Sequence, residues 1–189
     1  MFGDVIMKTI KIIILLPIVL GICFVNLWAI ASNPNQAISL EAEAVVVFAG
    51  GSGERFDFGL NLIKTHQIRY LLLSIGAIEW IDRERLKEHC STEHDSHIVS
   101  CIQTNLDTDN TLGEAKLFAE KLEKLGLNRV VVVSGKSHVY RASLSLSECF
   151  EGKVDRMGTA EIPTAELLVR EWLRIVHLRL ASLFGCHRW

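Results

Sequence analysis

The chain alternates between short runs of consecutive apolar residues and longer stretches in which apolar residues recur every three or four positions. The runs predict strands that are buried on both faces, at residues 44–50 (AVVVFAG), 70–76 (YLLLSIG), 97–102 (HIVSCI), 129–133 (RVVVV) and, more weakly, 153–157 (KVDRM). The longer stretches predict helices through Phe56, Leu60 and Ile63 and at residues 81–89, 111–125, 139–150 and 163–184. Strands that alternate with helices predict an α/β fold, a Rossmann-like and mostly parallel sheet with helices on both faces.

The N-terminal segment has a different pattern. Residues 12–31 contain no charged side chain, and Asn26 is their only strongly polar one. A helix of this length, rising 1.5 Å per residue, can cross the ~30 Å hydrocarbon layer of a bilayer. Lys8 and Lys11 precede the run, so the positive-inside rule predicts a cytoplasmic N-terminus. The sequence therefore predicts a single-pass protein of the cytoplasmic (inner) membrane, with its domain on the periplasmic, outer face.

Two other interpretations of this segment stay open. Residues 29–31 (AIA) have the A-x-A form of a signal-peptidase site, and the segment could also be a buried core helix. The apolar run exceeds the usual h-region of about 7–15 residues, which favours an uncleaved anchor. We expect a signal anchor or transmembrane helix at residues 1–31, a polar linker at 32–41 and an α/β domain at 42–189.

Charge and cysteine content bear on the protein's binding partners and on the state of its cysteines. The net charge of −2 at pH 7 gives no basic footprint for nucleic acid. Export would place Cys90, Cys101, Cys149 and Cys186 in an oxidising compartment, while Cys23 lies in the membrane segment. Four cysteines allow three pairings, and Cys90 and Cys101 are near enough in sequence to close a small loop. The alternative is that all four are small buried apolar residues.

Glycines and polar residues follow the predicted strands, where the ligand crevice of a parallel sheet lies. The loop with Gly50, Gly51 and Ser52 would let the backbone approach a ligand, although a tight strand-to-helix turn is the structural alternative. Arg55 favours an anionic ligand, because a guanidinium at the positive end of a helix is otherwise unfavourable. The spacing is not G-x-G-x-x-G, so the dinucleotide fingerprint fails.

A second group stands before the helix at 111–125. Thr111 and Glu114 have the spacing of a capping box, which would satisfy backbone donors at the helix start. Both residues therefore have a structural explanation beside a ligand-binding role. Asn110 is not needed by such a box, and its amide could face the crevice.

Residues 129–137 (RVVVVSGKS) raise the question of an ATP-binding loop. A Walker loop needs a glycine five residues before Gly135, and Val130 occupies that position inside the predicted strand. The predicted topology also places the loop outside the cytoplasm. The sequence therefore excludes a Walker site here.

What remains is Ser134 and Ser137 at a strand end, followed by His138 and Arg141. The spacing of the last two puts them on one face of the first helical turn. A neutral imidazole can act as general acid or base, and arginine can hold a phosphate with two hydrogen bonds. We expect His138 and Arg141 to be the catalytic pair if the protein is an enzyme.

Three segments, VVVFAGGSGER, DTDNTLGEA and VVVVSGKSHVYRA, resemble in order and spacing the signatures of the YdcF-like family. The resemblance covers roughly residues 42–160, and many members of the family have a single N-terminal membrane segment. His138, Arg141 and Ala142 fit its most specific motif, Arg55 matches the arginine after the first glycine loop, and Thr111, Glu114 and Ala115 match the middle signature. The resemblance implies a Rossmann-like domain with a polar crevice and a role in envelope biogenesis, without one settled reaction.

Two further segments have structural explanations. Residues 88–101 contain His89, Cys90, His94, His97 and Cys101, which are zinc-ligand types, but no C-x₂₋₄-C pair completes a closed site. We expect no metal and interpret the segment as an exposed loop. The arginines of the final helix are expected on a solvated face, with contact to anionic headgroups as the alternative.

These observations lead to one main hypothesis and two rivals. The main hypothesis is an outer-face envelope protein that binds a phosphate-bearing small molecule or lipid-linked precursor and hydrolyses or transfers it. The ligand would be held by residues of three segments: Gly50, Gly51, Ser52, Arg55, Asn110, Thr111, Glu114, Ser134 and Ser137. The rivals are a non-catalytic binding module and a cytoplasm-facing transferase that uses a nucleotide or S-adenosylmethionine. The sequence identifies no cofactor.

Overall fold

The computed structural model describes residues 17, 21–22, 25, 41–48, 53–75, 90, 93–94, 97–104, 110–160 and 164–182. Within these ranges a six-stranded sheet has the order β3-β4-β2-β1-β5-β6. Its strands are β1 (Ala44–Val47), β2 (Tyr70–Ile75), β3 (Glu93–His94), β4 (His97–Gln103), β5 (Arg129–Gly135) and β6 (Lys153–Thr159). All pairings are parallel except that of β3 with β4. The predicted Rossmann-like α/β sheet is confirmed.

The order of the strands creates one special position in the sheet. From β1 the chain builds outward through β2 and β4 on one side, and then returns to add β5 and β6 on the other. The carboxyl ends of β1 and β5 therefore form the topological switch point, where open α/β sheets bind their ligands. The residues after these two strands are consequently where a ligand-binding site is expected.

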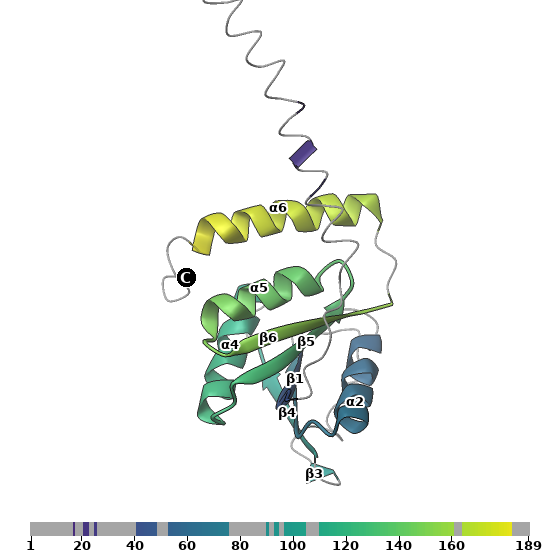
Figure 1. Cartoon of the computed structure of the whole chain (residues 1–189), viewed down its shortest axis with the longest axis vertical. Coiled ribbons are helices and arrows are strands. Elements are labelled where there is room, and N and C mark those ends of the chain that lie inside the picture. The colour runs from purple at the N-terminus through teal and green to yellow at the C-terminus, as the bar shows by residue number, and fades with distance from the viewer. Residues whose placement is uncertain are drawn as a thin grey trace, which may run out of the picture.

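Four helices are described: α2 (Glu54–His66), α4 (Thr111–Lys124), α5 (Val139–Cys149) and α6 (Ala165–Ser182). The first three cover the sheet. Alternate residues of β1 face opposite ways, so Val46 packs with α4 and α5 whereas Val45 packs with α2. Figure 1 shows α5 and α2 on opposite sides of the sheet. Both faces of β1 are fully buried, which explains its unbroken apolar run.

The last helix, α6, forms a further layer on the outside of α5 (Figure 1). Thr164 caps its start, since the hydroxyl accepts a hydrogen bond from the Leu167 N–H at 3.2 Å. Ile175 and Leu178 are buried on the inner face. The predicted core-packing helix is confirmed over Ala165–Ser182, and the rest of its predicted range lies outside the described residues.

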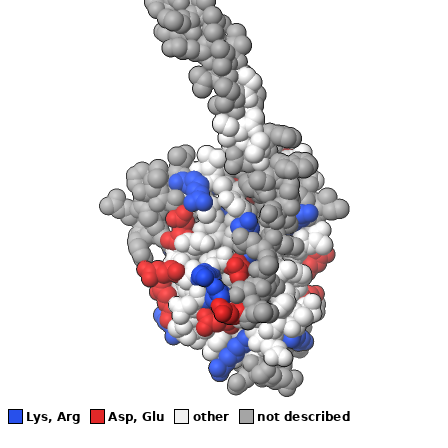
Figure 2. Space-filling model, in the orientation of Figure 1, with Lys and Arg blue, Asp and Glu red and all other residues white. Residues whose placement is uncertain are grey.

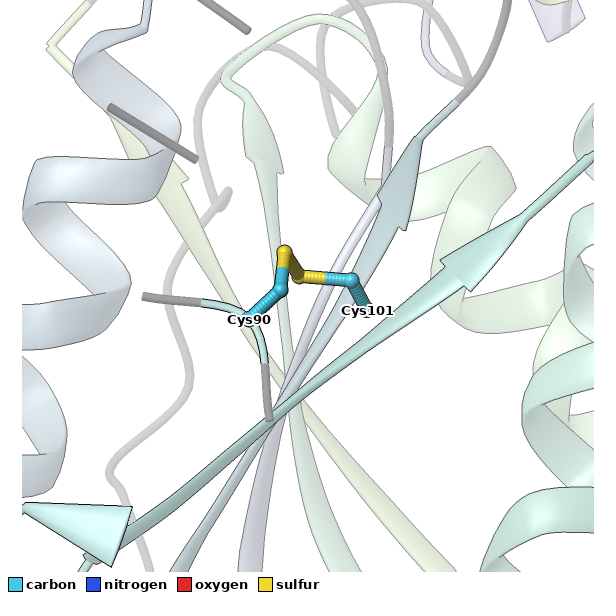
Figure 3. The surroundings of a disulfide bond; sticks show 2 residues. All are labelled: Cys90 and Cys101. Atoms are coloured by element: carbon cyan, nitrogen blue, oxygen red, sulfur yellow. A yellow bond between two sulfur atoms is a disulfide. The ribbon is translucent and has the colours of Figure 1, made fainter. Parts of the chain in front are cut away.

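A disulfide bond joins Cys90 to β4. Cys90 is bonded to Cys101 of β4 with a Cα–Cα distance of 5.4 Å (Figure 3), and Cys149 is also disulfide-bonded. The alternative that Cys90, Cys101, Cys149 and Cys186 are all small buried apolar residues without a disulfide is therefore wrong. Cys90 and Cys101, two of the candidate zinc ligands, are the two residues of this bond. The described residues contain no group of three or more His, Cys, Asp or Glu residues that could hold a metal ion.

Some predicted boundaries change. The strand β5 runs two residues further than predicted and includes Ser134, and β6 continues to Thr159. The two-residue strand β3 was not predicted, because it is too short to show a period and is defined by its hairpin pairing of His94 with His97. No helix within the described ranges is both long and apolar enough to cross a membrane. Most of the predicted anchor at 12–31 and the predicted helix at 81–89 lie outside those ranges.

Candidate functional site

A tight turn between β5 and α5 brings His138 back over the end of its own strand. The His138 N–H donates to the Gly135 carbonyl at 2.8 Å and closes this turn. The imidazole then lies between two hydroxyl groups: Nδ1 is 2.6 Å from Ser134 Oγ, and Nε2 is 3.2 Å from Thr111 Oγ1 at the start of α4. Residues from two helices and one strand thus meet at the switch point.

The two hydroxyls fit either tautomer of the imidazole. With the proton on Nδ1, His138 donates to Ser134 and the Thr111 hydroxyl donates to Nε2. With the proton on Nε2, His138 donates to Thr111 and Ser134 donates to Nδ1, which makes the Ser134 oxygen more nucleophilic. The His138 imidazole can therefore carry its proton on either nitrogen while Ser134 and Thr111 keep their positions.

The environment of His138 favours the neutral imidazole. Its side chain keeps some solvent exposure, and the ring of Phe48 packs edge-on against it with centroids 6.4 Å apart. Desolvation lowers the pKa of His138 well below its ordinary value of 6.5, and the positive charges of Arg141, Arg55 and Arg174 lower it further. A neutral ring close to neutral pH is the form that acts as a general base.

The guanidinium of Arg141 is held by a carboxylate from α6. Arg141 Nε donates to Glu171 Oε2 at 2.7 Å and Nη2 donates to Oε1 at 3.3 Å, while Nη1 donates to Thr111 Oγ1 at 2.5 Å. Arg174 Nη1 donates to the same carboxylate at 2.8 Å. The phosphate-holding fork predicted for Arg141 is thus occupied by Glu171, a residue that the sequence reasoning missed.

A signal for Glu171 is present in the sequence. It falls in the stripe of α6 that packs toward α5, at helical spacing with Leu168, Ile175 and Leu178, and it is 2% exposed. A carboxylate in an apolar stripe needs a cationic partner, because an unpaired buried charge is strongly unfavourable. That partner could not be identified without knowing that α6 packs on α5.

The start of α4 corrects one prediction. The helix begins at Thr111 and its N-cap is Asn110, whose side-chain oxygen accepts a hydrogen bond from the Gly113 N–H at 3.0 Å. The predicted capping box of Thr111 and Glu114 is therefore wrong. Because Asn110 supplies the cap, the Thr111 hydroxyl serves His138 and Arg141 instead. Buried Glu114 accepts a hydrogen bond from Ser74 at the end of β2, at 2.6 Å.

The remaining candidates lie in the neighbouring turns. Gly53 begins α2 with a φ of 83°, a left-handed conformation that favours glycine, so this glycine has a structural reason. Arg55, two residues later, acts on His138 through its charge. Ser137 is buried in the turn before α5. Gly50, Gly51 and Ser52 lie outside the described residues.

Charged side chains of both signs act on this site. On the face drawn in Figure 2, the described Lys and Arg side chains are interspersed with Asp and Glu, in keeping with the net charge of −2. The charges of Arg141, Arg55 and Arg174 disfavour protonation of His138, while Glu171 pairs with two of these arginines. No protein-family model matches the chain, and no curated protein sequence matches it either. The arrangement itself can bind an anion and exchange a proton beside it.

Proposed function

We propose that the protein is anchored by residues 12–31 in the cytoplasmic membrane and that its α/β domain, on the outer face, binds a phosphate-bearing precursor of the cell envelope. The ligand would be a small molecule or a lipid-linked compound. One observation carries the proposal: His138 is held between Ser134 and Thr111 at the switch point of the sheet, and the charges of three arginines disfavour its protonation. Such a site suits an anion that gains or loses a proton.

Two observations support the outer-face location. The disulfide between Cys90 and Cys101, together with the disulfide-bonded state of Cys149, is typical of proteins that mature in an oxidising compartment. The uncharged run at 12–31 has the length of a membrane span. The resemblance of three segments to the YdcF-like family agrees with both and suggests a role in envelope biogenesis.

The reaction that best fits these groups is hydrolysis or transfer at the phosphate. Arg55 and the backbone of the loop before α2 would hold the phosphate oxygens. Neutral His138 would take the proton of the attacking hydroxyl or water as the new P–O bond forms. The leaving oxygen would depart with the electron pair of the old bond and take its proton from solvent water. Arg141, whose fork is held by Glu171, would contribute its charge and its hydrogen bond to Thr111.

A non-catalytic binding module is the second candidate. The Ser134 side chain is fully buried and Arg141 is engaged by Glu171 and Thr111. A site in this arrangement could bind an anion through Arg55 and release it unchanged. The two candidates share the ligand class and differ in turnover.

Turnover of a phosphate monoester separates them. The full chain, purified in amphipol, is incubated with p-nitrophenyl phosphate, and the His138→Asn variant is assayed beside it. We expect turnover in the parent protein, a loss of at least about 100-fold in the variant, and retained phosphate binding in both. Phosphate binding without turnover in the parent would support the binding module. No phosphate binding would contradict both candidates.

The location is tested separately. A reporter that is active only in the periplasm, fused after Trp189, should be active, and a cytoplasmic reporter at the same place should be silent. The reverse pattern would contradict the outer-face location and favour the cytoplasm-facing transferase.

A further inference from the structure

A pocket of about 800 Å³ lies between the start of α4, the side of α5 and the inner edge of α6. It adjoins the site described above, because Thr111 and Arg141 line it and Thr111 also contacts His138. Its volume falls in the range of sites for small organic ligands, about 300–1,000 Å³. The pocket is therefore large enough for a ligand group well beyond a phosphate.

The lining has two chemically distinct parts. Arg141, Arg170 and Arg174 bring guanidinium groups to it. Glu171 pairs with Arg141 and Arg174, and Glu166 pairs with Arg170, so two carboxylates offset part of the charge of three cations. Leu112 from α4 and Leu173 and Leu178 from α6 supply apolar surface on the other walls. A ligand that complements both parts has an anionic end and an aliphatic body.

One polar group on the wall lacks a hydrogen bond. Ser145 lines the pocket from α5 and is 1% exposed, and its hydroxyl has no hydrogen-bond partner among the described residues. A buried hydroxyl without a partner is unfavourable. A ligand oxygen at this wall would remove that cost.

We propose that this pocket binds the aliphatic part of an amphiphile whose anionic group is the phosphate bound beside His138, with Thr111 and Arg141 at the border between the two. The inference rests on the proposed function, because the anionic group is the phosphate placed there. It goes further by selecting an amphiphilic ligand over a wholly polar one and by locating its apolar body beneath α6.

The test compares octyl phosphate with inorganic phosphate by isothermal titration calorimetry on the full chain in amphipol, after subtraction of a blank titration into amphipol alone. Each buried methylene strengthens binding roughly fourfold. We therefore expect octyl phosphate to bind at least about tenfold more tightly than phosphate. Octyl glucoside, which has the chain without the charge, should bind at least about tenfold more weakly than octyl phosphate.

Two substitutions on α6 locate the chain. Leu173→Asn should remove most of the preference for octyl phosphate and leave the Kd for inorganic phosphate unchanged. The matched control is Val169→Asn, one turn earlier; Val169 is 48% exposed against 57% for Leu173, but it does not line the pocket. This control should retain the preference, and an equal loss in both variants would indicate adsorption on the outside of α6 and overturn the inference.

The two proposals fail differently. If inorganic phosphate binds but the octyl chain adds nothing, the amphiphile inference is wrong and the phosphate site stands. If octyl glucoside binds as tightly as octyl phosphate, the ligand needs no anionic group and this part of the inference is wrong. If inorganic phosphate itself does not bind, the proposed function fails, and the amphiphile inference, which rests on it, fails too.

Discussion

The two ends of the parallel sheet use polar side chains in different ways. At the amino ends of β1 and β5, Glu43 Oε2 accepts hydrogen bonds from the backbone N–H groups of Asn128 and Arg129 at 2.6 and 3.0 Å, and Arg129 forms an ion pair with exposed Glu41. At the carboxyl ends, side chains bond to one another around His138. Glu43 at the amino end satisfies backbone hydrogen-bond donors, so its contribution to stability is enough to explain its contacts.

At the carboxyl end, stability alone is a poor explanation. His138 is an imidazole whose protonation is disfavoured by the charges of three arginines, and such a pairing of groups does not stabilise the fold. Perturbed titratable groups of this kind gather at functional sites. The comparison therefore predicts that changes at the amino end affect stability alone, and that changes at the carboxyl end also affect ligand binding.

The largest expected effect on stability comes from Glu171→Ala. The change leaves Arg141, whose side chain is 14% exposed, without its carboxylate, and breaking a buried ion pair from one side costs about 3 kcal/mol. The measurement is the free energy of unfolding from urea denaturation. The control Glu41→Ala removes an exposed partner of Arg129 and should cost less than about 0.5 kcal/mol. Equal costs would mean that the buried pair of Arg141 and Glu171 contributes no more to stability than an exposed pair does.

Glu43→Ala is expected to destabilise the fold by about 1.5 kcal/mol, because two backbone N–H groups lose a charged acceptor. Its Kd for inorganic phosphate should remain that of the parent protein. Urea denaturation and calorimetry on the same preparation measure both quantities. A weaker Kd in this variant would show that the amino end also serves the ligand.

Acidification should destabilise the protein through His138. Its pKa is depressed on folding, so below pH 6.5 the unfolded chain binds more protons than the folded one. The stability that depends on the neutral ring is complete above the unfolded pKa and is lost as the pH falls toward the folded pKa. Its slope cannot exceed about 1.4 kcal/mol per pH unit for one proton.

The comparison with His138→Asn isolates this contribution. The unfolding free energy of the variant should fall less than that of the parent between pH 7.5 and 5.5, since other groups titrate equally in both. Parallel profiles would mean that the imidazole is as easily protonated in the folded protein as in the unfolded chain.

The smallest expected effect comes from Asn110→Ala, which removes the cap of α4 and should cost about 1 kcal/mol. Asn110→Ser should restore most of it, because serine also caps well. A null result for the alanine variant in urea denaturation would argue that the predicted box of Thr111 and Glu114 takes over the cap.

The fold was predictable because its core strands are buried on both faces. The run at 44–50 and the valines of β5 have no polar alternation, which is typical of a covered parallel sheet. The hairpin strand β3 could not be predicted, because two residues carry no periodicity and its place depends on pairing with β4.

The site was predictable in part. Ser134 and Arg141 each lie within four residues of His138 in sequence, so local geometry was enough to bring them to it. The contacts of Thr111 and Glu171 depend on how α4 and α6 pack against α5, with sequence separations of 27 and 30 residues. Spacing alone offered a capping box for Thr111, because it does not show that the helix is capped one residue earlier, by Asn110.

The most direct test of the account is the binding of inorganic phosphate to the full chain by calorimetry, with two arginine variants. Arg55→Ala removes a charge that acts on His138 at the carboxyl end, whereas Arg129→Ala removes one at the amino end. Arg55 is the better probe than Arg141, because Arg141 is also a structural partner of Glu171. We expect Arg55→Ala to weaken the Kd at least about tenfold and Arg129→Ala to leave it unchanged. Equal Kd values in all three proteins would contradict a phosphate site at the switch point of the sheet.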